Sequence, residues 1–172
     1  MPRNAVKSVL VSCVFSLWAC ATGSALAASP VEFIEQARTA GIAEIESSRL
    51  AIQRTSATDI NSFAVEMIKD YTNTNRHLSE LADRLGLSLA PVEQLEQQAR
   101  AAMFEAPQGD GFDAAYVVHQ IEAHEAMIKL FQQQAEDPEV PALQELVRQT
   151  LPTLEMHLAM AKKLQMTHRQ DE

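Results

Sequence analysis

The feature that most constrains this chain is the spacing of its apolar residues, which follows the period of an α-helix from about residue 31 onward. Between residues 59 and 85, for example, apolar residues recur three and four positions apart and fall on one stripe. No segment alternates β-branched and polar residues as a strand does, and the chain has only five glycines. The pattern predicts an all-α protein whose long helices each bury one face.

Breaks in this pattern divide the chain into four long helices. We expect them at about 29–54, 58–85, 112–136 and 140–166. Ser29 followed by Pro30 is typical of a helix start, and Gly86 is typical of the residue that ends one. The next strong break is the Gly-Asp-Gly sequence at 109–111. Pro152 lies inside the fourth helix, which it either kinks or divides in two.

The lengths of the connections predict how the helices are arranged. About four residues join the first helix to the second and the third to the fourth, so each pair is expected to form an antiparallel hairpin. The connection between the hairpins is roughly 25 residues long, enough to cross the bundle, and includes a polar helical piece near 91–104. We expect a ferritin-like four-helix bundle, two hairpins joined by one long crossover that contains a short helix. A plain up-down-up-down bundle is the alternative.

Four segments, one from each long helix, carry a resemblance to a known family. They read AEIESSRLA, MIKDYTNTNRHLSEL, FDAAYVVHQIEAHEAMIKLF and TLPTLEMHLAMAKKL. Together they resemble a bacterial family of exported ferritin-like proteins, usually labelled as uncharacterised or as outer-membrane proteins. The resemblance covers nearly all of residues 28–172. It implies the ferritin-like fold and export, and it implies no particular activity.

Residues 1–27 are predicted to be a secretory signal peptide. Its first seven residues include two basic residues, Arg3 and Lys7, and no acidic one. An apolar run too short for a membrane span follows, and small residues that suit cleavage before Ala28 end the segment. We therefore expect residues 28–172 to form one helical-bundle domain in the periplasm or cell envelope. The sequence around Cys20 also resembles a lipoprotein box, so a lipid anchor through Cys20 is the alternative.

Cysteine usage and charge exclude several classes of function. Cys13 and Cys20 are the only cysteines and lie in the predicted leader, so residues 28–172 can form no disulfide and no thiolate metal site. Those residues carry 12 basic and 23 acidic side chains, a formal charge of −11. This charge repels the phosphate backbone, so nucleic acid is not expected as a partner. No membrane-spanning segment is expected there either.

Titratable side chains on the apolar stripes are the candidates for chemistry, because ferritin-like bundles build metal sites from inward-facing carboxylates and histidines. The inward-facing candidates are Glu44 on the first helix, Asp70 and Tyr71 on the second, His124 on the third and His157 at the border of the fourth stripe. Their separations from the two predicted turns are similar, so we expect one cluster near the middle of the bundle. The other three histidines, His77, His119 and His168, are expected to face solvent.

Two interpretations of this cluster remain open. Two histidines with one or two carboxylates can hold a single divalent ion of Fe, Mn or Zn. The same residues can form a closed hydrogen-bond network without metal. In either case His124 should be buried and within hydrogen-bonding or shared-ligand distance of at least one of Glu44, Asp70, Tyr71 and His157, because an unpaired buried polar group costs about 1–3 kcal/mol.

The sequence therefore predicts an exported helical bundle with a central polar cluster that binds a metal or a small ligand, in a role related to stress or to the envelope. The alternative is a structural or interaction protein of the cell envelope, whose acidic surface contacts an envelope protein and which has no metal and no catalysis. A metal-dependent oxidase is the least favoured function. A di-iron centre uses two Glu-x-x-His pairs, and the chain contains none.

Overall fold

The computed structural model describes residues 28–105, 107, 111–136 and 140–168. Within them the chain forms five helices and no strand. The helices are α1 (Pro30–Arg54), α2 (Thr58–Leu85), α3 (Val92–Ala102), α4 (Phe112–Ala135) and α5 (Pro141–Thr167). The all-α prediction is confirmed, and the four long helices occupy nearly the expected ranges. The predicted signal peptide, with both cysteines, lies outside the described residues.

Local signals fix the helix ends. The Glu32 N–H donates to Ser29 Oγ over 3.3 Å, and the Ser29 N–H donates to the Glu32 carboxylate over 3.0 Å, a reciprocal cap at the start of α1. Gly86 ends α2 with φ of 65°, a left-handed conformation that glycine adopts without steric cost. α5 continues through Pro152 as one helix, so this proline does not divide it.

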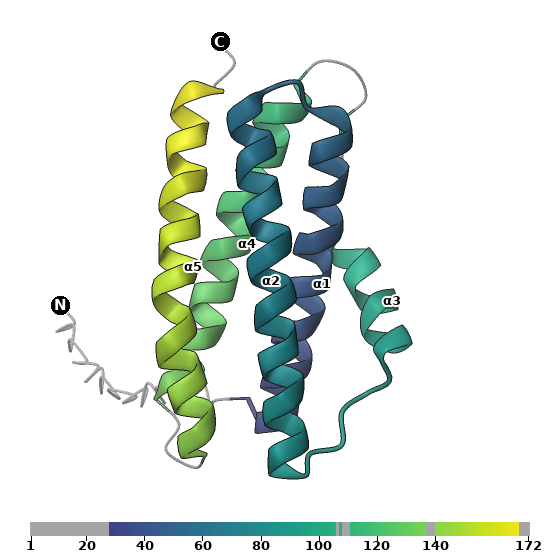
Figure 1. The fold of residues 1–172 in the computed structure, drawn as a ribbon, viewed down its shortest axis with the longest axis vertical. Coiled ribbons are helices and arrows are strands. Elements are labelled where there is room, and N and C mark those ends of the chain that lie inside the picture. The colour runs from purple at the N-terminus through teal and green to yellow at the C-terminus, as the bar shows by residue number, and fades with distance from the viewer. Residues whose placement is uncertain (1–27, 106, 108–110, 137–139, 169–172) are drawn as a thin grey trace, which may run out of the picture.

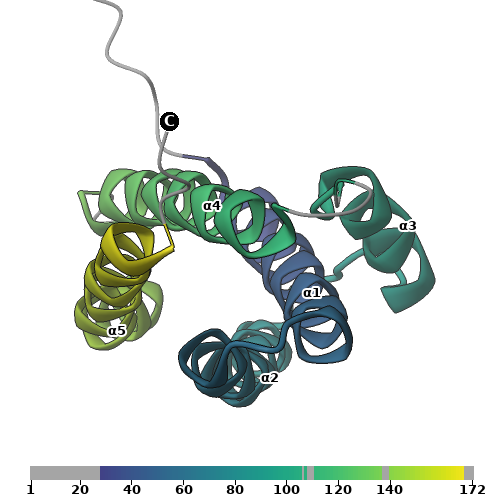
Figure 2. The same cartoon turned by 90° about the horizontal axis from the view of Figure 1, so that it is seen from above.

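The long helices are arranged as two antiparallel hairpins. Figure 1 shows α1 beside α2 and α4 beside α5, with the two helices of each pair running in opposite directions. The hairpins face each other, so that α1 contacts α4 and α2 contacts α5 (Figure 2). α2 and α4 run in the same direction, and α3, which lies between them in sequence, packs on the outer side of α1.

The apolar stripes of the four long helices meet in one core. Among its largest fully buried side chains are Phe33, Ile34, Ile60, Met67, Tyr116 and Phe131. α3 adds Leu95 and Ala99, which are buried although α3 lies outside the four-helix arrangement. At Gly41, α1 and α2 approach closely, because a Cβ atom there would lie 2.5 Å from Asn75 Oδ1.

Two seams join the hairpins, the α1–α4 seam and the α2–α5 seam, and among the described residues only the first is covered by a further segment. Phe104, which follows α3, packs its ring against those of Phe112, Tyr116 and His119, with centroids 5.2–6.0 Å away. Its N–H donates to Ser47 Oγ over 3.2 Å. In Figure 2, α3 lies on the α1 side of the bundle, away from the α2–α5 seam.

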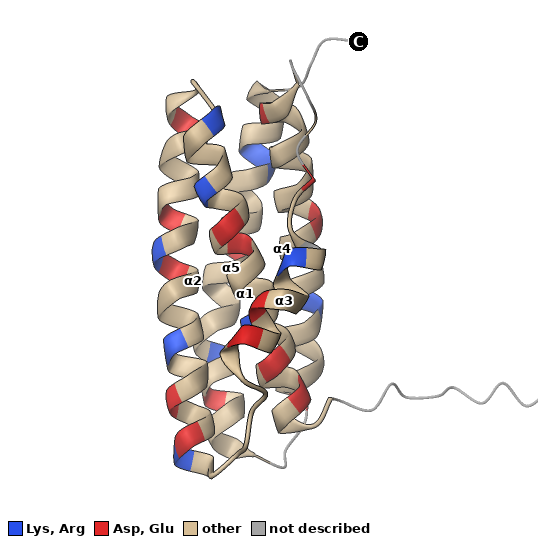
Figure 3. Cartoon of the chain, turned by 90° about the vertical axis from the view of Figure 1, so that its right-hand side faces the viewer, with Lys and Arg blue, Asp and Glu red and all other residues tan. Residues whose placement is uncertain are grey.

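The surface carries charges of both signs. Figure 3 faces α3 and shows acidic positions on α3, with acidic and basic positions interspersed along the long helices. None of the helices among the described residues has an apolar stretch long enough to cross a lipid bilayer.

Candidate metal centre

His124 lies at the centre of the bundle, and both of its ring nitrogens have partners. It is fully buried, and its Nδ1 lies 2.7 Å from the backbone oxygen of Gln120, to which it must donate. Nε2 is then the acceptor, and the Tyr71 hydroxyl donates to it over 3.1 Å. The buried, hydrogen-bonded state predicted for His124 is confirmed.

Both members of this pair are held in their neutral forms. Burial lowers the pKa of His124, although the negative charge of Glu44 acts in the opposite direction. Burial also raises the pKa of Tyr71 well above its usual value, and the charge of Glu44 adds to that effect. A neutral phenol donating to a neutral imidazole is therefore the stable arrangement.

Glu44 is buried, but it pairs with α4 in the α1–α4 seam. Its Oε2 accepts a hydrogen bond from Gln120 Nε2 over 2.7 Å, and its Oε1 lies 3.5 Å from His119 Nε2. The expectation that His119 faces solvent is wrong, because Phe104 covers it and only 22% of its side chain is exposed. Glu44 thus reaches the central histidine only indirectly, through Gln120.

Asp70 and His157 meet across the α2–α5 seam. His157 Nε2 lies 3.1 Å from Asp70 Oδ2, and Lys69 Nζ lies 3.8 Å from the other carboxylate oxygen. His157 was expected at the border of its apolar face, and the structure buries it, with 1% of the residue exposed. Burial lowers the pKa of His157, while the hydrogen bond and charge of Asp70 act in the opposite direction.

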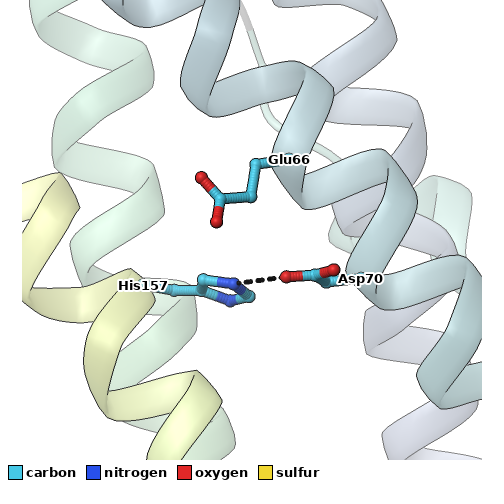
Figure 4. Close-up of side chains that lie close together, drawn as sticks. All are labelled: Glu66, Asp70 and His157. Atoms are coloured by element: carbon cyan, nitrogen blue, oxygen red, sulfur yellow. Dashed lines mark hydrogen bonds and ion pairs between the residues drawn. The ribbon is translucent and has the colours of Figure 1, made fainter.

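Glu66 completes a group of three potential metal ligands with Asp70 and His157. One carboxylate oxygen of each acid and one ring nitrogen of His157 all lie within 4.8 Å of one another. Figure 4 shows the two carboxylates extending from α2 towards the imidazole on α5. No other group of three such ligands occurs in the described part of the chain. Sequence reasoning missed Glu66, although its position one turn before Asp70 puts both acids on one face of α2.

The donor set fits a divalent transition metal. Carboxylate oxygens and a neutral imidazole nitrogen together suit Mn²⁺, Fe²⁺ and Zn²⁺. Nδ1 of His157 is buried without a hydrogen-bond partner, so the ring's contact with the acidic groups is through Nε2. Three protein ligands leave coordination positions free for water or another ligand, as in metal sites that carry out chemistry.

The group of Glu66, Asp70 and His157 (the three-ligand group) adjoins the hydrogen-bonded pair of Tyr71 and His124 (the central pair). The rings of His157 and His124 lie edge to face with centroids 5.5 Å apart, and the Tyr71 ring centroid is 6.1 Å from that of His157. Four of the five predicted site residues, Asp70, Tyr71, His124 and His157, therefore lie together. The two remaining histidines of the chain lie outside this cluster. His77 is exposed as expected, whereas His168, also expected to face solvent, is mostly buried, with its Nε2 2.9 Å from Asp59 Oδ2.

Beyond Asp70, the α2–α5 seam widens into a groove. Its volume is about 610 Å³, and its walls are mainly polar side chains from successive turns of the two helices. Asp70 and Thr74 belong to the α2 wall, and Gln149 and Thr153 belong to the α5 wall. Because Asp70 also belongs to the three-ligand group, the group lies at one end of this groove.

Comparison with known protein families identifies a matching family model. A family model described as a domain of unknown function (DUF4142) matches residues 19–164. No curated protein and no solved structure matches the chain.

Proposed function

This chain belongs to the DUF4142 family, and we propose that it binds a single divalent metal ion through Glu66, Asp70 and His157. The observation that carries the proposal is the approach of three ligand atoms to within 4.8 Å of one another across the α2–α5 seam. The ion is of the Mn²⁺, Fe²⁺ or Zn²⁺ class, as the mixed oxygen and nitrogen donors favour. We infer a binding protein rather than an enzyme.

Charge and protonation support this assignment. Two carboxylates balance the charge of a divalent ion. Metal binding requires a neutral imidazole, and the lowered pKa of the buried His157 favours that form. The Asp70 side chain is 21% exposed, so an ion can reach the site from the groove.

Metal titration of the purified protein tests the proposal. We expect one Mn²⁺ per chain by isothermal titration calorimetry, and Glu66→Gln, Asp70→Asn and His157→Gln should each weaken binding by more than about tenfold. Glu80→Gln and His77→Gln are matched controls, because both side chains are exposed on α2 outside the group and should leave binding unchanged. Unaltered Mn²⁺ affinity in the Asp70 and His157 variants would contradict the proposal.

A structural role for the polar cluster is the alternative, and one observation favours it. The Asp70–His157 and Tyr71–His124 hydrogen bonds already pair these groups without an ion. Under this alternative the cluster fixes how the hairpins dock, and an envelope protein contacts the acidic surface. Asp70→Asn would then change the melting temperature by the same amount with and without Mn²⁺.

We further propose that the bundle is ferritin-like and that the protein is exported. The antiparallel hairpins and the parallel α2 and α4 support the first statement, and the composition of residues 1–27 supports the second. N-terminal sequencing of the protein from its native host should begin at Ala28. A mature form that begins at an acylated Cys20 would identify a lipoprotein instead.

A further inference from the structure

We propose that the groove between α2 and α5 binds a small hydroxycarboxylate, which coordinates the metal ion and extends along the groove. This inference rests on the proposed metal site and names the ligand that occupies its open positions. Asp70 provides the physical link, since its carboxylate belongs to the three-ligand group and lines the groove.

Apart from the metal ligand Asp70, the acidic side chains of the groove are already paired with arginines. Glu80 accepts from Arg76 over 2.7 Å, and Glu145 accepts from Arg148 over 2.5 Å. Glu145 also accepts from Gln149 over 2.7 Å. These carboxylates are therefore partly neutralised and need no cation from a ligand.

Several hydrogen-bond donors of the groove are free, although Gln149 and Thr150 are already engaged. Within the described residues Asn73, Thr74 and Thr153 make no side-chain hydrogen bond, although all three line the groove. His77 adds a further donor, because Arg76 Nη2 lies 3.0 Å from its Nε2 and must donate to it, which leaves the proton on Nδ1. A groove with paired acids and free donors suits a ligand rich in acceptor oxygens.

Two of these donors lie beside the metal ligands. Thr74 is one turn after Asp70 in α2, and Thr153 is one turn before His157 in α5. Because α2 and α5 run in opposite directions, Thr74 and Thr153 lie on the same side of the three-ligand group along the bundle, and both line the groove. One helical turn rises about 5.4 Å, so a four-carbon acid bound to the ion can reach both hydroxyls.

Charge selects an anion. A divalent ion balances Glu66 and Asp70, and Lys69, 3.8 Å from Asp70, adds a positive charge. The open coordination positions then favour anionic oxygen ligands. A 2-hydroxycarboxylate offers two oxygens that chelate one ion and a second carboxylate that can accept from the threonine hydroxyls.

The test uses Mn²⁺-loaded protein and L-malate, with the water-proton relaxation rate as the readout. We expect malate to displace water from bound Mn²⁺ and lower the relaxation rate while equilibrium dialysis shows that Mn²⁺ stays on the protein. Thr74→Val and Thr153→Val should each weaken malate binding about fivefold, the effect of one hydrogen bond. Thr72→Val is the matched control, because that exposed hydroxyl donates to Ile68 O and does not line the groove.

The other outcomes are distinguishable. Succinate lacks the hydroxyl and should bind more weakly than malate, and equal binding would overturn the chelating mode. A relaxation rate that malate does not change, removal of Mn²⁺ from the protein by malate, or unaltered malate affinity in both threonine variants would refute the ligand while the metal site stands. Absence of Mn²⁺ binding would refute the metal site and this inference together.

Discussion

The α1–α4 and α2–α5 seams contain the same residue types in different surroundings. In the α1–α4 seam, the buried Glu44 lies 3.5 Å from His119, and Phe104 covers the contact. In the α2–α5 seam, Asp70 lies 3.1 Å from His157 and also lines a groove. A carboxylate near a histidine is therefore common to both, and it does not by itself define a binding site.

The two seams differ in their access to solvent and in the presence of a third potential metal ligand. Glu44 is already bonded to Gln120 and lies where the chain after α3 packs. The α2–α5 seam has Glu66 as an additional carboxylate, and no segment in the described part of the chain covers it as α3 and Phe104 cover the other seam. We interpret the α1–α4 seam as the one that stabilises the bundle and the α2–α5 seam as the one that binds a ligand. The following predictions test this division, from the largest expected effect to the smallest.

Truncation of a buried side chain in the α1–α4 seam should reduce the stability of the protein most. Phe33 and Phe131 are buried with ring centroids 5.0 Å apart, so Phe33→Ala should lower the free energy of unfolding by about 3–5 kcal/mol. Leu146→Ala, in the groove of the other seam, removes a half-buried side chain and should cost less than about 2 kcal/mol. Urea denaturation measures both, and equal losses would contradict the division.

The central pair should show strong coupling. Tyr71→Phe leaves the buried Nε2 of His124 without its donor and should cost about 1–3 kcal/mol. His124→Leu leaves the Tyr71 hydroxyl unpaired at a similar cost. The double variant removes both polar groups and should be more stable than the sum of the single losses predicts. Additive losses of the free energy of unfolding in a urea double-mutant cycle would show that this hydrogen bond does not stabilise the fold.

Acidification should destabilise the metal-free protein. His124 and His157 have lowered pKa values in the fold, so below the ordinary histidine pKa of about 6.5 the unfolded chain binds more protons. The free energy of unfolding should therefore fall as the pH falls below about 6.5, by up to about 1.4 kcal/mol per pH unit for each histidine. His124→Gln should reduce this slope in urea titrations with chelator present. His77→Gln is the control, because His77 is exposed and should not affect this slope. An equal reduction of the slope in the control would show that the burial of His124 is not its cause.

The smallest loss of stability is expected from removing a partly exposed contact between α2 and α5. His168 Nε2 lies 2.9 Å from Asp59 Oδ2, and this hydrogen bond lowers the pKa of Asp59. Because the Asp59 side chain is 46% exposed, His168→Ala should cost less than about 1 kcal/mol. The loss should shrink further at high salt. A larger, salt-independent loss of thermal stability would show that this end of the seam is structural.

The helices could be predicted from the sequence because their ends depend on neighbouring residues. Ser29 and Glu32 cap α1 within one turn, and Gly86 ends α2 through its own backbone conformation. Whether Pro152 divides α5 could not be predicted, since that depends on packing around the helix, and α5 is continuous. The side of the bundle on which α3 packs depends on the same long-range contacts.

The site was less predictable for a related reason. Periodicity identifies which face of α2 is buried, and so it selects Asp70 and Tyr71. It does not indicate which edge of that face meets α5, and for this reason Glu66 was missed. His119 was misplaced because the covering Phe104 comes from a distant segment. The metal-binding role of the group stays a prediction.

The two-hairpin arrangement has a consequence for the order of folding. Each hairpin joins helices that are neighbours in sequence, whereas Asp70 and His157 are 87 residues apart. Local contacts form faster than distant ones because less chain entropy is lost on closing the loop. We therefore expect the hairpins to form first and the seams to close last. Asp70 and His157 then meet only in the final docking step, so a metal ion that binds them acts on the completed bundle and slows its opening.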